Sequence, residues 1–147
     1  MKLEITENAC DFIEDIAEAE AECFSEPWSK DAVSDFLSYA YNGALICLAD
    51  GCFSGYVTYT NICGEVQIAN VATKVQFRRC GVGSALMEAL VALSKKADAD
   101  VITLEVRSKN VPAISLYEKY GFVTVGVRKN FYKKPDDDAV LMNLQLQ

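Results

Sequence analysis

Apolar positions at the start of the chain recur first with the period of a strand and then with that of a helix. Leu3 and Ile5 predict a short strand. Ser29 can cap a second helix, ahead of an apolar side that includes Val33. The stripe of the first helix, with acidic residues expected on the opposite face, comprises Phe12, Ile16, Ala19 and Cys23.

Three consecutive antiparallel strands are expected next. Residues 44–49 and 52–59 flank Asp50-Gly51, a dipeptide that suits a tight hairpin turn. Cys63-Gly64 makes a second turn, which leads into residues 65–73. Simple alternation in that third strand predicts two faces, one with Val66, Ile68, Asn70 and Ala72 and the other with Gln67, Ala69, Val71 and Thr73.

The second half of the chain alternates helices and strands. A helical stripe runs from Val82 to the cationic pair Lys95-Lys96, which is favourable at a helix C-terminus, and residues 100–107 then form a strand. Asn110 can cap a short helix that Gly121 ends, and strands near residues 122–131 and 139–146 form a closing hairpin. This order predicts a single α/β domain over residues 1–147, with a mixed, mostly antiparallel sheet of about seven strands and helices on both faces.

Charge and composition narrow the chemistry. Lysine and arginine number 14 against 21 aspartates and glutamates, and the net charge of −7 disfavours nucleic acid and favours cationic partners. Histidine is absent, which excludes Ser/His/Asp triads, Cys/His pairs and histidine-ligated metals. Proton transfer near pH 7 therefore depends on a carboxylate, tyrosine, lysine or cysteine.

Cysteine usage and the lack of long apolar runs predict a reduced, cytoplasmic protein without a membrane partner. The longest apolar run, residues 44–49, is far shorter than the roughly 20 residues of a membrane span, and the first residues lack the features of a secretory signal. The six cysteines are expected to be free and mostly buried. Cys47 and Cys52 lack a second ligand pair, so we expect no structural metal.

A glycine-containing loop, Arg78-Arg79-Cys80-Gly81-Val82-Gly83-Ser84, precedes the predicted helix at Val82. Free N–H groups at a helix start bind anions, and the glycines allow a phosphate to approach the backbone. An ordinary turn with a solvated basic pair is the alternative. Leu86 stands where a P-loop requires its second glycine and where the dinucleotide fingerprint requires a small residue, and no Walker lysine is present, so neither ATP nor NAD is favoured.

The same loop resembles the signature Gln/Arg-x-x-Gly-x-Gly/Ala of the GNAT superfamily of N-acetyltransferases, and the resemblance spans nearly the whole chain. Lys74-Val75 and Phe131 depart from the residues that the family often has there. Four further segments resemble the RimI type, the ribosomal-protein-alanine N-acetyltransferases: Pro27-Trp28-Ser29, residues 104–110, residues 113–118 and Gly121-Phe122.

The resemblance implies acetyl-CoA as co-substrate and no metal. Asn110 would touch acetyl-CoA, and Cys80 is expected to pack, because no activating base is available to make it a nucleophile. The pantetheine arm would pair with the backbone of Val71, Ala72 and Thr73. The pyrophosphate would be held by Arg79, Cys80, Gly81, Val82, Gly83 and Ser84.

Glu105 and Tyr117 are the candidate base and acid. Glu105 interrupts an apolar strand, and partial desolvation of a carboxylate favours proton acceptance. A structural ion pair with Arg107 on the same face is the alternative. Taken alone, the helical spacing of Tyr117 predicts a residue that packs in the core. The resemblance implies instead that the Tyr117 phenol protonates the departing CoA thiolate.

The function that these residues and the resemblance predict is acetylation of a protein's N-terminal α-amino group. The resemblance implies a small-subunit ribosomal protein as acceptor, and the amine would attack the thioester directly. Two alternatives remain at this point. One is acetylation of a small amine such as a polyamine or an aminoglycoside, and the other is a non-catalytic domain that binds acetyl-CoA.

Overall fold

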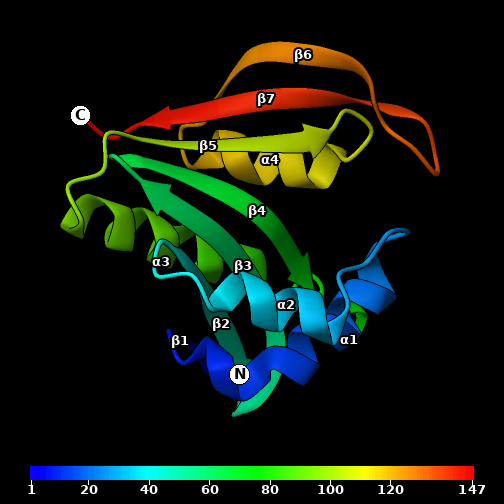
Figure 1. Cartoon of the computed structure of the whole chain (residues 1–147), viewed down its shortest axis with the longest axis vertical. Coiled ribbons are helices and arrows are strands. Elements are labelled where there is room, and N and C mark those ends of the chain that lie inside the picture. The colour runs from blue at the N-terminus through cyan, green and yellow to red at the C-terminus, as the bar shows by residue number, and fades with distance from the viewer.

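The computed structural model describes all 147 residues and contains a seven-stranded sheet in the order β1-β2-β3-β4-β5-β7-β6 (Figure 1). Every neighbouring pair is antiparallel except β4 and β5. The predicted mixed, mostly antiparallel sheet is confirmed. The strands are β1 Leu3–Thr6, β2 Asn42–Ala49, β3 Cys52–Ile62, β4 Glu65–Thr73, β5 Val101–Arg107, β6 Val123–Tyr132 and β7 Asp137–Gln145.

Helices cover both faces of the sheet, as the sequence predicts (Figure 1). One buried cluster joins α1 and α2 to the sheet and includes Ile16, Val33 and Tyr56. A second cluster joins α3 and α4 to the opposite face and includes Leu86 and Leu90. The helices are η1 Ala9–Phe12, α1 Ile13–Cys23, α2 Lys30–Leu37, η2 Val75–Phe77, α3 Val82–Lys96 and α4 Val111–Lys119.

Local signals in the sequence account for most element ends. Both residues of the Asp50-Gly51 turn and of the Cys63-Gly64 turn have positive φ, as tight hairpins require. The Ser29 hydroxyl accepts from the backbone N–H of Ala32, and α2 follows it. The strand ends lie within three residues of the predicted ones, and the largest difference is at the end of β3. β7 begins early because Asp137 pairs with Tyr132 across the turn.

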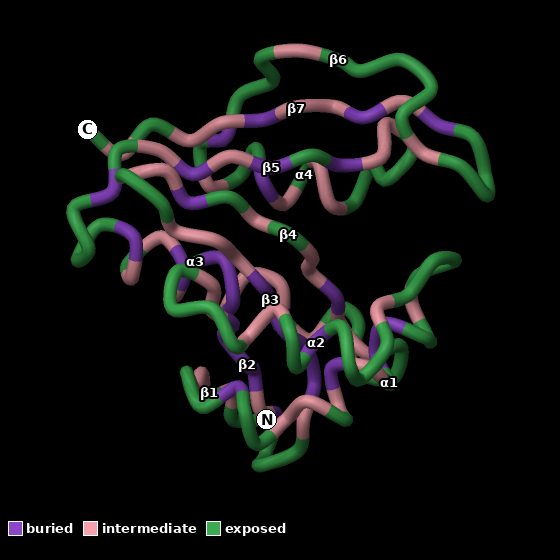
Figure 2. The backbone as a smooth tube through the Cα atoms, viewed as in Figure 1, coloured by how far each residue is buried: buried purple, intermediate pink, exposed green.

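Burial of the cysteines differs from the prediction. All six thiols are free, but only Cys47 is buried. Cys63 is exposed because it belongs to a hairpin turn, and Cys52 is exposed because it is the first residue of β3, next to the other turn. No helix combines the length and apolar character needed to span a membrane. Figure 2 shows that buried positions of β5 alternate with intermediate or exposed ones and that no residue of β6 is buried.

A β-bulge in β4 overturns the predicted simple alternation of that strand. Thr58 of β3 pairs with Asn70, but the next residue pairs with Ile68, so Ala69 is an extra residue. One extra residue exchanges the two faces of a strand. Ile68 therefore packs against the cluster under α3 and α4, whereas Ala72 belongs to the cluster under α1 and α2.

The sheet opens between β4 and β5. Their parallel ladder covers only Glu65–Gln67 against Val101–Thr103. Beyond these pairs, β4 continues along β3 and β5 continues along β7, and the two strands diverge (Figure 1). The edge of β4 from Ile68 to Thr73 is thus left without a neighbouring strand.

Candidate active site

A cleft of about 630 Å³ lies where β4 and β5 diverge. Its walls come from the segment that joins α1 to α2, from β4, from β5, and from the turn between β6 and β7. Four residues that the sequence nominates lie in its lining: Val71, Glu105, Asn110 and Tyr117.

Glu105 lies on the face of β5 opposite the buried Leu104 and Val106. Its side chain is 34% exposed, and Oε1 is 3.7 Å from Nη1 of Arg128 on β6. The alternative pairing with Arg107 is wrong, because that guanidinium donates to the carbonyl oxygens of residues 133 and 135 instead, at 3.1 and 2.7 Å. The Glu105 carboxylate is thus partly accessible in the cleft, beside a cation that the sequence did not nominate.

Tyr117 combines the two interpretations that its sequence context allows. The residue is only 6% exposed, and its ring packs against Phe122 at 5.7 Å between centroids. Burial, with a smaller effect of Tyr132, raises the pKa of the Tyr117 phenol to about 12. The hydroxyl makes no hydrogen bond within the chain. It is nevertheless accessible, because Ser94 Oγ is the one buried side-chain polar atom without a hydrogen-bond partner. The ring therefore belongs to the core, while the hydroxyl reaches the cleft.

The glycine loop lies at the start of α3, outside the lining of the cleft. Gly81 caps the helix with φ +86° and provides no side-chain bond, so N–H groups of the first turn stay free to bind an anion. Arg78 and Arg79 are exposed, and neither belongs to an ion pair of the chain. Gly83 permits close packing: a Cβ there would lie 3.0 Å from Cδ2 of Leu116 on α4.

The residues nominated on β4 follow the bulge. Val71 lines the cleft, Ala72 is buried, and the Thr73 carbonyl accepts a weak hydrogen bond from the Cys23 thiol at 3.6 Å. The open edge of this segment can pair with an extended, amide-containing chain as another strand would. Asn110 accepts from the Ala113 N–H through Oδ1, which leaves its amide nitrogen free to donate. These features fit the pantetheine arm and the phosphates of acetyl-CoA.

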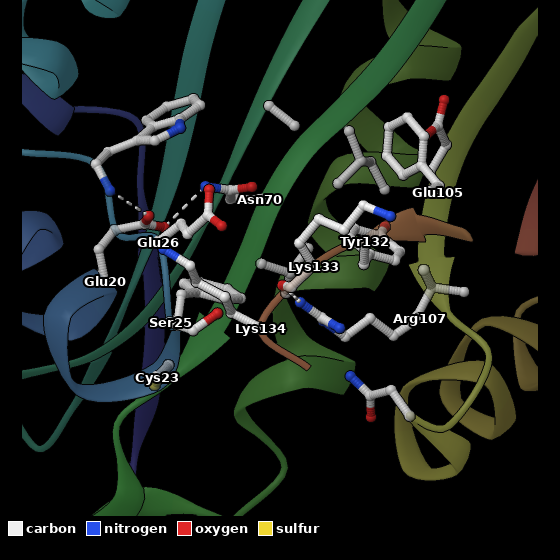
Figure 3. A pocket seen from close by; sticks show the side chains of 18 of the residues that line it. Glu20, Cys23, Ser25, Glu26, Asn70, Glu105, Arg107, Tyr132, Lys133 and Lys134 are labelled. Carbon is white, nitrogen blue, oxygen red and sulfur yellow. Dashed lines mark hydrogen bonds between the residues drawn. The ribbon is translucent and has the colours of Figure 1, made fainter. Parts of the chain in front are cut away.

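Glu20 is a residue of the cleft that the sequence interpretation missed. It was expected on the solvent face of the first helix, but it is fully buried, because it lies four residues after Ile16 on the apolar stripe. Oε1 accepts from the Trp28 N–H at 2.9 Å, and Oε2 accepts from Asn70 Nδ2 at 2.9 Å (Figure 3). Oε2 also accepts from the Tyr56 hydroxyl. The spacing from Ile16 was the available signal.

The turn between β6 and β7 forms the opposite wall of the cleft. Arg107 lies over the ring of Tyr132 at 4.5 Å, in addition to its two bonds to the carbonyl groups of Lys133 and Pro135. Figure 3 shows Arg107 and Tyr132 on the side of the cleft away from Glu20. One arginine of β5 thus holds the turn in place.

Comparison with known proteins agrees with this geometry. The chain is 37% identical over 131 residues (88% of this chain, 87% of the relative) to a Bacillus subtilis protein provisionally named a [ribosomal protein bS18]-alanine N-acetyltransferase. It is 32% identical over 137 residues (91% of this chain, 92% of the relative) to the [ribosomal protein bS18]-alanine N-acetyltransferase of Haemophilus influenzae. The crystal structure of the ribosomal-protein-S18-alanine N-acetyltransferase from Escherichia coli has the same fold, with a TM-score of 0.92 at 24% identity over 99% of this chain and 95% of that one. Residues 13–122 match the Acetyltransferase (GNAT) family, and the chain belongs to that family.

Proposed function

We propose that this GNAT acetyltransferase transfers the acetyl group of acetyl-CoA to the N-terminal α-amino group of a protein. The observation that carries the proposal is the divergence of β4 and β5 after three ladder pairs. It places an unpaired strand edge in the same cleft as the Glu105 carboxylate and the Tyr117 hydroxyl. A linear thioester and an amine can meet in such an opening.

The acceptor that we propose is the N-terminal alanine of ribosomal protein bS18. The relatives from B. subtilis and H. influenzae carry that substrate in their names and match about nine tenths of the chain. The net charge of −7 favours association with a basic ribosomal protein. The reaction would take place in the cytoplasm, where ribosomal proteins are made.

Two groups of residues would hold acetyl-CoA. The backbone of Val71, Ala72 and Thr73 offers the open edge of β4 to the pantetheine arm. The loop from Arg79 to Ser84 offers free N–H groups, the positive end of the α3 dipole and the exposed guanidinium of Arg79 to the pyrophosphate. When bound, acetyl-CoA supplies a thioester carbonyl carbon that an amine nitrogen can attack.

Glu105 and Tyr117 would manage the protons of this reaction. A free α-amino group has a pKa of about 7.7 to 8.0, so much of it is protonated at pH 7 and must lose a proton before it can attack. Glu105 accepts that proton, directly or through water. As the new N–C bond forms and the C–S bond breaks, Tyr117 donates towards the departing sulfur. Its pKa of about 12 keeps the phenol protonated at neutral pH.

An acceptor panel tests the proposed function. Release of CoA thiol would be measured with peptides that begin with the bS18 sequence, with polyamines and with aminoglycosides. We expect the alanine peptide to give the highest kcat/KM. A preference for a small amine would overturn the peptide assignment, and no turnover with any acceptor would favour an acetyl-CoA-binding role. Mass spectrometry of bS18 from cells that lack the chain provides the second test, and loss of N-terminal acetylation is expected.

A further inference from the structure

We propose that Glu20 is a positioning residue that holds the acceptor side of the cleft in shape. The proposal rests on the proposed function: the residues proposed for acetyl-CoA leave the wall formed by the segment between α1 and α2 unassigned, and we assign that wall to the acceptor. Glu20 touches three structural elements at once: the segment between α1 and α2 through Trp28, strand β3 through Tyr56, and strand β4 through Asn70. One side chain thus links these three elements through hydrogen bonds.

The bulge in β4 explains why Asn70 needs such a partner. The extra residue Ala69 turns the Asn70 side chain towards α1, and Asn70 Nδ2 donates to Glu20 Oε2 at 2.9 Å. The backbone at Asn70 is also bonded to the Thr58 hydroxyl, at 3.0 Å from its N–H. Glu20 thus helps to fix the bulge, which is the point where β4 begins to line the cleft.

The surroundings of Glu20 indicate that its role is to hold neighbouring groups in position. The carboxylate is fully buried, forms no ion pair and accepts from neutral donors only. A buried carboxylate is tolerated when several donors satisfy it. Burial and, next, the hydrogen bond to Glu20 raise the pKa of the Tyr56 hydroxyl, so Tyr56 remains a donor at every physiological pH. All the hydrogen-bond partners of Glu20 are thus groups that set the positions of the segment between α1 and α2, of β3 and of β4.

The acetyl-CoA side of the site is held by other contacts. The end of β4 is bonded to α1 through the Cys23 thiol and Thr73, and Glu22 accepts from the Val75 N–H at 2.6 Å. The start of α3 is tied to α4, where the Tyr120 hydroxyl donates to the Ser84 carbonyl at 3.1 Å. Loss of Glu20 should therefore change acceptor binding and spare acetyl-CoA binding.

Glu20→Gln is the central variant. Glutamine keeps the volume, but its amide nitrogen can only donate, so the Asn70 amide and the Tyr56 hydroxyl must turn over to accept from it, and the charge-assisted bonds of the carboxylate are lost. We expect KM for the alanine peptide to rise by about tenfold or more, with kcat and the KM for acetyl-CoA within about threefold of wild type. Glu14→Gln is the matched control, since it removes the same charge from an exposed position of the same helix whose only ion pair is with Lys30 at the surface, and it should leave KM for the peptide unchanged.

A swapped pair separates geometry from charge. In the double variant Glu20→Gln with Asn70→Asp, the glutamine amide can donate to the carboxylate introduced on β4 and to the Tyr56 oxygen, while its carbonyl accepts from Trp28. We expect this double variant to recover peptide KM to within about threefold of wild type. If it stays as impaired as the single variant, the carboxylate at position 20 is itself required and the positioning role is wrong.

Amide hydrogen exchange provides a readout that does not depend on activity. Glu20→Gln should accelerate exchange in residues 24–28 and 68–71, with little change in residues 78–86. If wild type acetylates no peptide, the proposed function fails, and exchange alone decides on Glu20. If Glu20→Gln does not fold, Tyr56→Phe, which removes one donor, should show the same pattern at smaller amplitude. Unchanged exchange and unchanged peptide KM would overturn the proposal.

Discussion

Replacement of Tyr117 by phenylalanine separates the catalytic and packing contributions of this residue. Phenylalanine keeps the ring that packs against Phe122 and removes only a hydroxyl without a partner in the chain. The free energy of unfolding of the variant should therefore lie within about 0.5 kcal/mol of wild type. Its acetyl-CoA affinity should also be retained, because the ring and backbone are unchanged.

The magnitude of the catalytic loss follows from the pKa of the phenol. A thiol such as that of cysteine has a pKa of about 8.5, so full proton transfer from a phenol of pKa about 12 is uphill by about 3.5 units, or roughly 5 kcal/mol. Tyr117 must therefore act mainly as a hydrogen-bond donor to the sulfur as charge develops. A bond to a charged group contributes about 1.5 to 3 kcal/mol, which predicts a decrease in kcat of about 10- to 150-fold.

The assay is kcat of wild type and Tyr117→Phe from pH 6 to 10, with urea unfolding as the control. The phenol is the active form below its pKa, and that pKa lies near 12, so wild type should show no alkaline loss from Tyr117 in this range. Two results would refute the reasoning: kcat in the variant above half of wild type, or an alkaline loss in wild type below pH 10 that the variant lacks.

Three further substitutions have distinct expected outcomes. Glu105→Gln should lower kcat by about 100-fold or more without changing acetyl-CoA affinity in calorimetry. The residual rate of the variant should rise between about pH 7 and 9 as the α-amino group of the acceptor deprotonates. Unchanged kcat would exclude Glu105 as the base. Gly81→Ala introduces a side chain at φ +86°, where its Cβ would make only an ordinary contact with Leu3 Cδ1 at 3.8 Å. The cost is therefore that of the backbone conformation, and urea unfolding should show a loss of about 1 to 2 kcal/mol; an unchanged midpoint would contradict this. The hydrogen bond from Ser108, with two from backbone N–H groups, lowers the pKa of Asp137. The contribution of Asp137 to the free energy of unfolding is therefore full above about pH 4 and is lost as pH falls through the lowered pKa. Asp137→Asn should reduce the thermal midpoint at pH 7 and match wild type near pH 2.

Local signals predicted the elements of the fold because each is encoded within a few residues. The Asp50-Gly51 turn, the Ser29 cap and the Asn110 cap all bond to groups no more than a few positions away. The Val82 helix followed from its apolar spacing alone. Strand order and the parallel pairing of β4 with β5 depend on contacts between distant segments, which periodicity does not encode.

The site was predicted only in part for the same reason. Glu105 and Tyr117 were found through their motifs, and the structure places both in one cleft. The bulge at Ala69 cannot be recognised from the pattern of apolar and polar residues. The face of the sheet on which the Asn70 side chain lies was therefore predicted wrongly. Glu20 was assigned to the acidic surface of α1 because carboxylates are rarely buried, although its helical position beneath Ile16 pointed inwards.

The short ladder between β4 and β5 also has a mechanical consequence. Three residue pairs, with two bonds to the Gly64 carbonyl beside them, form the only strand ladder between a four-stranded half of the sheet, β1 to β4, and a three-stranded half, β5, β7 and β6. A small rotation of one half against the other would change the width of the opening without breaking any other strand pair. Substitutions far from the cleft, in the strands of either half, can therefore change turnover by altering this rotation. A ligand that contacts both halves across the cleft would restrict the rotation.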